Sequence, residues 1–271
     1  MRSNRFKMYA CIAAFAGLAA VLNPGLASAL TYGSNITIYD GEGVTYEDNE
    51  VEVGMDLKQK WDLEGVFLNG TMLTMVGGFD FKNGVTGYPT YTSGDLFIST
   101  DSVYGSPIKD IVTGDGQKNV TNNFGYEYAL AIDWNTLTFK TYKLDTADTT
   151  TTVYYALNET GLATSNPWKY YSGGEDRNIT GSVAYFNNVT DSGFLGMSDS
   201  SKHYAVQIDL TDVFADANLY GKDFYTHFTM GCGNDNLIGH GVAPVPEPST
   251  MLLFGAGLAG LALARRRFAK K

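Results

Sequence analysis

The chain has 271 residues and a formal net charge of −10 at pH 7. Its acidic residues all lie in residues 30–247, where 29 of them stand against only 11 basic residues, a net charge of −18. So acidic a region argues against nucleic acid and anionic membranes as partners, because both repel negative charge. About 215 residues between the terminal segments suffice for one domain with a sizeable core.

Residues 1–29 have the three parts of a secretory signal peptide. Basic residues precede an apolar run over residues 8–22, and the small residues Ala27 and Ala29 then mark a cleavage site. The alternative is a transmembrane anchor, but the run of about 15 residues is shorter than the roughly 20 that span a bilayer. We expect cleavage after Ala29, so that the mature protein is exported and begins at Leu30.

Between the termini, apolar and polar residues alternate with a period of two in many short segments, which is typical of half-buried strands. The clearest patterns cover residues 126–134, 204–210 and 224–232. Further candidate strands are 32–39, 72–76, 96–99, 137–144, 153–157 and 182–186. About ten short strands predict an all-β fold, an antiparallel β-sandwich of jelly-roll type, for an ectodomain over residues 30–243.

Turn-forming residues separate these segments. They occur at Asn69-Gly70, Asn83-Gly84, Ser93-Gly94-Asp95, Gly114-Asp115-Gly116 and Ser172-Gly173-Gly174. Residues 134–137 join two strong strand patterns and predict a tight hairpin. Residues 51–65 are ambiguous and could carry a short helix, and residues 145–152, a run of Asp and Thr, are expected to form an exposed loop.

The residues that commonly perform catalysis do not form a recognisable constellation. His203, His227 and His240 lack the spacing of a zinc site. His227 and Cys232 are five residues apart, which places them on opposite faces of a regular strand. The apolar pattern around Cys232 predicts a buried thiol. Acidic residues are plentiful enough for a glycosidase pair, but no pair is marked out, so we expect no catalytic residues and a protein that is not an enzyme.

The pattern requires no cofactor, and calcium is the ion that the loops could best accommodate. Calcium takes six to eight oxygen ligands, often from flexible loops. Asp115, Asp176, Asn234 and Asp235 lie in loops of this kind, none of them with EF-hand spacing. The alternative for residues 233–236 is a turn in which Asn and Asp bond their own backbone.

Aromatic side chains in loop-like stretches are candidate platforms for sugar rings. They are Tyr88, Tyr91, Trp168, Tyr170 and Tyr171. Core filling explains many of the other aromatic residues equally well. A calcium-assisted, lectin-like domain that binds exopolysaccharide is therefore a second hypothesis beside a structural or adhesive role.

Residues 244–271 combine a stiff stem, an apolar run and a basic cluster. Pro246, Glu247 and Pro248 form the stem, because each proline fixes its own φ. Residues 251–264 are wholly apolar and predict a short transmembrane helix, whose 14 residues make a marginal anchor in the inner membrane. The basic tail, residues 265–271, keeps this end in the cytoplasm and begins with Arg265, Arg266 and Arg267.

This order of parts resembles the PEP-CTERM sorting signal. The resemblance implies that exosortase, an integral-membrane enzyme, removes the tail and passes the protein to the cell surface. Such signals occur in Gram-negative bacteria that make exopolysaccharide, which implies a cell-surface or extracellular-matrix location. Residues 94–98, 124–128 and 226–235 are also similar to an exosortase-dependent surface protein family, whose domain would cover residues 63–239. That second resemblance adds a class of protein and no mechanism.

Overall fold

The computed structural model describes residues 30–38, 56, 58–87, 90–100, 117–122, 124–145, 150–154, 166–189 and 202–245. From Tyr32 onward these residues belong to one compact unit. The predicted signal peptide and the predicted helix at residues 251–264 lie outside the described residues. Within the described ranges, no helix has the length and apolar character needed to cross a membrane.

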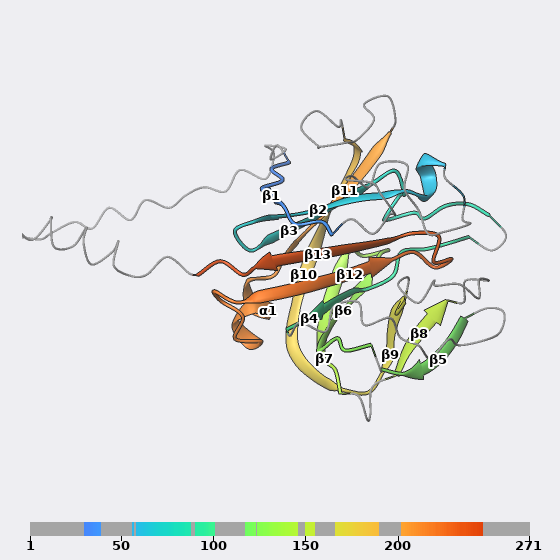
Figure 1. Ribbon diagram of the computed structural model, residues 1–271. Helices are drawn as coiled ribbons and strands as arrows, with labels where there is room; N and C mark the ends of the chain where they lie inside the picture. Colours follow the sequence, from blue (N-terminus) through green and yellow to red (C-terminus); the bar gives the residue numbers. More distant parts are fainter. Residues whose placement is uncertain are drawn as a thin grey trace, which may run out of the picture. The chain divides into compact units, whose positions relative to one another are not determined.

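The described residues form two antiparallel sheets, a ten-stranded one and a three-stranded one (Figure 1). The larger sheet has the order β1-β2-β3-β11-β10-β7-β6-β4-β12-β13, and the smaller has the order β5-β8-β9. The elements are β1 Ser34–Asn35, η1 Gln59–Trp61, β2 Leu63–Asn69, β3 Met72–Gly77, β4 Leu96–Ser99, β5 Gln117–Thr121, β6 Tyr128–Asp133, β7 Thr138–Lys143, β8 Thr150–Tyr154, β9 Lys169–Ser172, β10 Glu175–Val189, β11 His203–Asp209, α1 Thr211–Asp216, β12 Asp223–Thr229 and β13 Asn236–Val242.

The ten-stranded sheet curls until its two edges meet. The segment that continues β1 donates a hydrogen bond from the Ile36 N–H to the Val66 carbonyl of β2, 2.9 Å away. On its other side, the Ile36 carbonyl accepts a hydrogen bond from the His240 N–H of β13, and the Ile38 N–H donates to the Ile238 carbonyl, both at 2.8 Å. The first strand therefore lies in a seam between β2 and the last strand.

The inner face of the curled sheet holds the main core. Leu130 and Ile132 of β6 point inward, as period two requires. The rings of Phe81 and Phe228 lie 5.4 Å apart at the centre of this core, and Trp134 stacks on Phe81 at 6.4 Å. Burial of each such apolar side chain stabilises the fold by about 1.5–3 kcal/mol.

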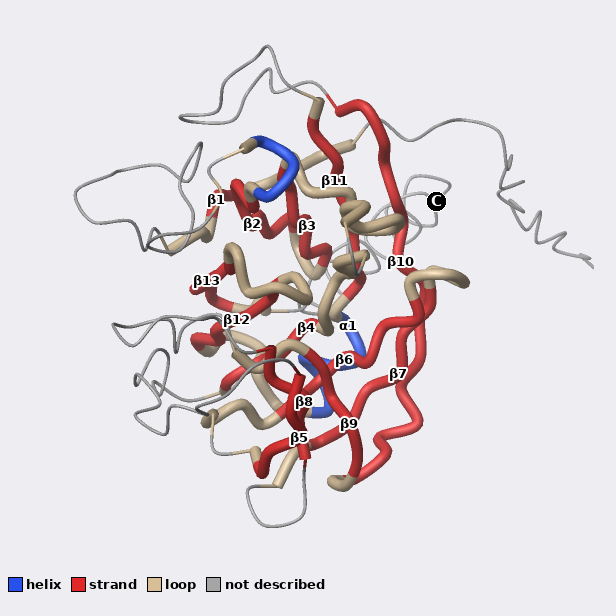
Figure 2. The backbone as a smooth tube through the Cα atoms, turned by 90° about the vertical axis from the view of Figure 1, so that its right-hand side faces the viewer, coloured by secondary structure: helices blue, strands red, loops and turns tan. Residues whose placement is uncertain are grey.

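The three-stranded sheet covers part of the outer face. Phe97 of β4 and Ala129 of β6 point away from the main core and pack with Tyr126 in a second, smaller cluster. Tyr170 of β9 packs against this cluster from the other sheet. Figure 2 shows β5, β8 and β9 of that sheet side by side. Both faces of β4 and β6 are therefore buried where β9 lies over them.

The all-β, antiparallel prediction is confirmed, in the form of a curled sheet. β4 and β6 fall within the predicted strands 96–99 and 126–134, and β11 overlaps the predicted strand 204–210, beginning one residue earlier. The hairpin at residues 134–137 is also present, with the Asp133 carboxylate accepting two N–H bonds from the turn. The jelly-roll arrangement of a two-sheet sandwich stays a prediction.

Two segments that we expected to be loops belong to strands. Tyr170 and Tyr171 lie in β9, and Thr150 begins β8, although residues 146–149 of that predicted loop lie outside the described part of the chain. The reason is that β8 and β9 pair with each other, with Thr151 opposite Tyr170. The polar threonine-rich segment thus obtains its backbone partners inside the small sheet.

The turn expected at Ser93-Gly94-Asp95 is absent. The Gly94 N–H donates to the Thr229 carbonyl and the Asp95 N–H donates to the Trp168 carbonyl, both at 2.9 Å, so this segment is extended between two neighbours. Glycine is needed there for close approach, because a Cβ would lie 2.4 Å from the Trp168 carbonyl oxygen. In the ambiguous region 51–65, η1 supplies one short 3₁₀ turn before β2 begins.

Candidate functional site

The folded sheet ends at one buried residue, Ala243. Antiparallel pairing of β12 with β13 extends to Asp223 opposite Val242. Beyond it, the Ala243 N–H donates to the Lys222 carbonyl at 2.9 Å, and the Ala243 carbonyl accepts from the Gly221 N–H at 2.8 Å. Ala243 is fully buried, whereas Val245 is 66% exposed. The chain therefore leaves the domain between these two residues.

Residues 244–267 match the family profile of the PEP-CTERM protein-sorting motif. The chain carries a PEP-CTERM sorting motif. The match contains the proline–glutamate–proline stem and the three arginines, and it begins directly after buried Ala243. The PEP-CTERM motif directs exosortase-dependent sorting to the cell surface. No curated protein and no solved structure is significantly similar to the chain.

Two of the four candidate calcium ligands fasten distant segments of the PEP-CTERM protein together. The Asp235 carboxylate is buried and accepts hydrogen bonds from the Leu63 N–H at 2.6 Å and the Asn236 N–H at 2.8 Å. The Asn234 side chain bonds both the N–H and the carbonyl of Asp56, each at 3.1 Å. These contacts join the turn between β12 and β13 to the segment before β2.

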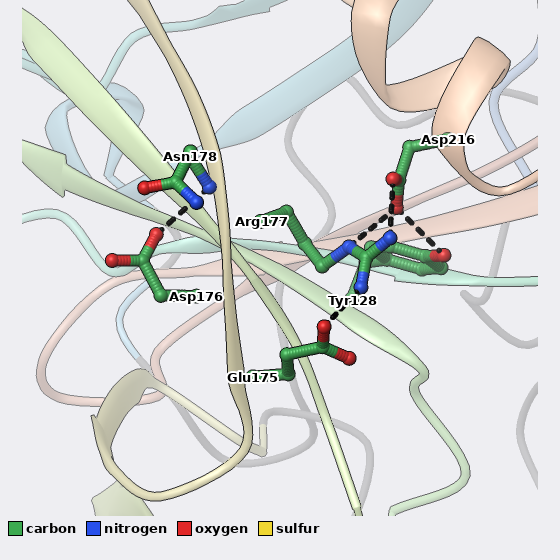
Figure 3. Close-up of polar contacts among 6 residues, drawn as sticks. All are labelled: Tyr128, Glu175, Asp176, Arg177, Asn178 and Asp216. Carbon is green, nitrogen blue, oxygen red and sulfur yellow. Dashed lines mark hydrogen bonds and ion pairs between the residues drawn. The ribbon is translucent and has the colours of Figure 1, made fainter.

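Asp176 forms an ion pair with Lys140, 2.6 Å away, at the start of β10. It also accepts a hydrogen bond from the Asn178 N–H at 2.9 Å, in a bulge where Asn178 has a φ of 56° (Figure 3). The Lys140 ammonium, together with this N–H, holds the pKa of Asp176 below its ordinary value. Asp115 lies outside the described residues, among which no three His, Cys, Asp or Glu side chains converge on a possible metal position.

On the opposite side of β10, Arg177 reaches helix α1 (Figure 3). Its guanidinium donates two hydrogen bonds to the Asp216 carboxylate, at 2.6 and 2.9 Å, and pairs with Glu175 at 2.6 Å. The Tyr128 hydroxyl donates to the same Asp216 carboxylate at 3.1 Å. Burial, with the charge of Asp216, raises the pKa of Tyr128 to about 12. Sequence reasoning missed this cluster because its members come from three elements far apart in the chain.

The three histidines do not gather at one place. His227 is fully buried, its Nε2 lies 3.1 Å from the Pro167 carbonyl oxygen, and burial lowers its pKa to about 4. His203 forms a buried pair with Glu64 at 2.9 Å, and His240 pairs with exposed Asp223 at 2.9 Å. Each imidazole thus has a structural contact of its own.

Cys232 is buried as the sequence predicts, and burial raises the pKa of its thiol to about 11. A thiol with so high a pKa is neutral at physiological pH, and a neutral thiol is a poor nucleophile. The pKa of the His227 imidazole is shifted the other way, so the imidazole is neutral as well. Neither group has the charge state of a thiolate–imidazolium pair.

The aromatic residues proposed as sugar platforms differ in their burial and packing. Trp168 is buried, and Tyr91 packs edge-on against Trp61, whereas Tyr88 lies outside the described residues. Tyr170 stacks on Tyr142 of β7, with ring centroids 4.1 Å apart and planes within 14° of parallel. Tyr171 is 60% exposed. The aromatic surface that remains therefore lies on β7 and β9.

Beside this stacked pair, an open groove of about 400 Å³ runs over the outer face of β6, β7 and β10. We call it the polar groove, and it is lined by Ala131, Asp133, Thr138, Phe139, Lys140, Thr180, Gly181 and Ser182. Two rows of residues cross the three strands in register. They are Ala131, Lys140, Thr180 and, in the next row, Asp133, Thr138, Ser182.

Proposed function

We propose that the protein is exported by its signal peptide, held briefly in the inner membrane of a Gram-negative cell, and then displayed at the cell surface or in the extracellular matrix. There its β-rich domain has a structural or adhesive role and catalyses no reaction. The observation that carries this proposal is the PEP-CTERM match at residues 244–267. The predicted signal peptide at residues 1–29 and the predicted helix at residues 251–264 supply the export and the temporary anchor.

The position of the motif supports removal of the tail from a domain that is already folded. Three peptide steps separate Ala243, the last buried residue, from Pro246. A chain of this length spans at most about 11 Å. Exosortase would therefore work close to the edge of β13, and a cut at the motif would leave every strand of the domain intact.

A non-catalytic role is supported by the engagement of the chemically able side chains in structural contacts. His227 and Cys232 are both buried and neutral at physiological pH, for the reasons given above. Asp176 and Asp235 each accept a backbone N–H bond. Groups bound in this way stabilise the fold and are poorly placed to exchange protons with a substrate.

The test follows the size and location of the product in the native cell. Replacing Glu247 with Ala, or deleting residues 265–267, is expected to leave full-length precursor in the membrane fraction. The matched control is Glu175→Ala, since Glu175 is an exposed glutamate far along the chain from the motif. Mature-sized extracellular product from both motif variants would overturn the sorting proposal, and mass spectrometry of its ends would locate the cuts.

A second candidate function is calcium-assisted binding of exopolysaccharide, as in a lectin. It is favoured by the polar groove, which is open to solvent beside the Tyr142–Tyr170 pair. A glycan array probed with the mature protein tests it. Binding that is lost on addition of a chelator would support the calcium-assisted form, and silence across diverse glycans would leave the structural role alone.

A further inference from the structure

The polar groove lies on the outer face of β6, β7 and β10, next to the row that contains Tyr142. The next row on the same outer face consists of Ala129, Tyr142 and Asp176. In that row, Tyr170 of β9 lies 4.1 Å from the Tyr142 ring, and Ala129 is fully buried. One row further, Ala131 is partly buried. Asp95 accepts the N–H groups of both Ile132 and Tyr170, so β9 lies beside β6 at this level as well. The groove therefore has an aromatic wall at the end where Tyr142 lies.

The floor of the groove is shallow because its side chains are short. Ala131, Thr180 and Ser182 carry at most two heavy atoms beyond Cβ and stand beside the longer Lys140. At Gly181, the inward direction is filled by the Phe139 ring, which would lie 2.5 Å from an added Cβ. Gly181 thus lets Phe139 pack from the core side while leaving only backbone on the groove side.

The groups on this floor suit a polyhydroxylated ligand. Three hydroxyls can both donate and accept hydrogen bonds, and the Asp133 carboxylate accepts them. Carbon atoms make up most of the exposed lining and offer an apolar surface to the C–H face of a sugar ring. The rows lie about 7 Å apart along the strands, and the strands about 4.8 Å apart, which spreads these groups over a surface rather than around a point. A volume of about 400 Å³ is at the small end for ligand sites, and its openness lets a chain continue beyond it.

The negative charge of the protein favours uncharged polysaccharides over anionic ones. Among the described residues that line the groove, Lys140 carries the only positive charge, and it is already paired with Asp176 at 2.6 Å. The charge of Lys169 in β9 acts on Asp133 at the edge of the groove. The surrounding mature chain carries a net charge of −18, which repels uronic acids and sulfated sugars. The affinity for an uncharged polysaccharide is not reduced by this repulsion.

We propose that the polar groove binds a neutral polysaccharide, with one sugar ring over Ala131 and its hydroxyls bonded to Thr138, Thr180 and Ser182. The adjoining ring contacts the edge of the Tyr142–Tyr170 pair. No metal ion takes part, because the groove itself supplies both donors and acceptors. This proposal takes polysaccharide binding from the second candidate function in a metal-free form, as an alternative to calcium-assisted binding, and it relies on the proposed surface display for the encounter with polysaccharide.

The test is native gel electrophoresis of the mature protein through gels that contain dextran, mannan or hydroxyethylcellulose. Alginate serves as an anionic polysaccharide and gelatin as a polypeptide probe. We expect at least one neutral polymer to retard the protein, with no effect of a chelator. Ser182→Trp, which fills the groove, is expected to weaken this binding at least tenfold. Asn187→Trp is the matched control, since Asn187 is an exposed residue of the same strand outside the groove, and it should bind like the wild type.

A smaller substitution keeps the test valid if the Ser182→Trp variant misfolds. Thr180→Val removes one hydroxyl and keeps a β-branched side chain of the same shape, so the strand is preserved. Loss of one hydrogen bond predicts a three- to tenfold weaker interaction. No retardation by neutral polymers, equal retardation of the wild type and Ser182→Trp, sensitivity to chelator, or retardation by alginate or gelatin alone would each overturn the proposal. Because sorting is measured separately in cells, a failure here is distinct from a failure of surface display.

Discussion

Asp216 of α1 receives two hydrogen bonds from the guanidinium of Arg177 in β10, at 2.6 and 2.9 Å. The two residues are 39 positions apart, so this contact ties the short helix to the long strand. A bidentate pair of this kind fixes the angle between its partners as well as their distance. The Tyr128 hydroxyl bonds the same carboxylate and brings β6 into the link.

Replacing Arg177 with Met is expected to lower the thermal midpoint by a few degrees, because the partly buried Asp216 carboxylate then loses its cationic partner and both guanidinium hydrogen bonds. The control is Glu175→Gln, which removes the other, 66% exposed carboxylate that Arg177 contacts. Exposed pairs contribute little, so this variant should unfold like the wild type. Thermal scans followed by circular dichroism compare the two, and equal midpoints for both variants would contradict a role for the Arg177–Asp216 pair.

Asp95 gives the stability a dependence on pH. Its buried carboxylate accepts the Ile132 N–H at 2.8 Å and the Tyr170 N–H at 2.9 Å, and so joins β6 to β9. Burial raises its pKa to about 7, against the opposing effect of these donors. Between pH 4 and 7 the folded state therefore holds a proton that the unfolded state has released, and this contribution to stability is lost as the pH rises through about 7.

We expect the wild-type protein to lose about 1–3 kcal/mol more stability between pH 5 and pH 8 than Asp95→Asn does. The variant should also be less stable than the wild type at pH 5, because the Asn NH2 group meets one of the two backbone N–H donors, whereas both oxygens of the protonated acid can accept. Urea unfolding at the two pH values measures both quantities. Parallel pH profiles for the two proteins would show that Asp95 does not titrate in this range.

His227 acts in the opposite direction. Burial lowers its pKa to about 4, so between pH 4 and 6.5 the unfolded chain binds a proton that the folded state does not. Stability from this residue is present above pH 6.5 and is lost as the pH falls toward 4. His227→Gln keeps a donor for the Pro167 carbonyl. Its unfolding free energy should vary less than that of the wild type from pH 6.5 down to pH 4, and an unchanged slope would contradict this assignment.

The junction at Ala243 predicts how processing depends on spacing. Deleting Pro244 and Val245 would place the motif directly after a buried residue whose N–H and carbonyl are both bonded. Access to the motif would then require breaking those bonds, so we expect precursor to be processed several-fold more slowly. A Gly-Ser-Gly-Ser insertion between Val245 and Pro246 should be processed at least as fast as the wild type. Pulse–chase labelling gives the rates, and equal rates for deletion and insertion would show that the fold does not limit access.

Much of the sheet could be predicted because its strands alternate. The sequence predicts β4 at its observed bounds, Leu96–Ser99, from a short apolar run, although the turn expected directly before it is absent. β2 was missed because Glu64 looks like a surface residue, although it is buried against His203. β13 was missed because its glycines resemble a turn. In the fold, a Cβ on Gly239 would lie 2.6 Å from the Thr226 hydroxyl oxygen, so glycine is there for close packing.

The candidate functional site likewise has one part that the sequence predicts and other parts that depend on the fold. The sorting motif consists of consecutive residues, so it can be recognised from the sequence without knowledge of the fold. The partners of Asn234 and Asp235 lie 178 and 172 positions away, at Asp56 and Leu63, and no local pattern indicates them. The polar groove depends on the pairing register of β6, β7 and β10, which brings side chains from separate segments into the same rows.

The seam between Ile38 and Ile238 has a consequence for how such a chain matures. A polypeptide that crosses a membrane through a narrow channel, starting from its amino end, delivers Ile38 early and Ile238 near the finish. Contacts between residues so distant form slowly. Under the proposed export, the seam can form only after about 240 residues have passed, and the sorting motif follows it directly in the chain. The domain would then close at about the stage at which its tail reaches the membrane.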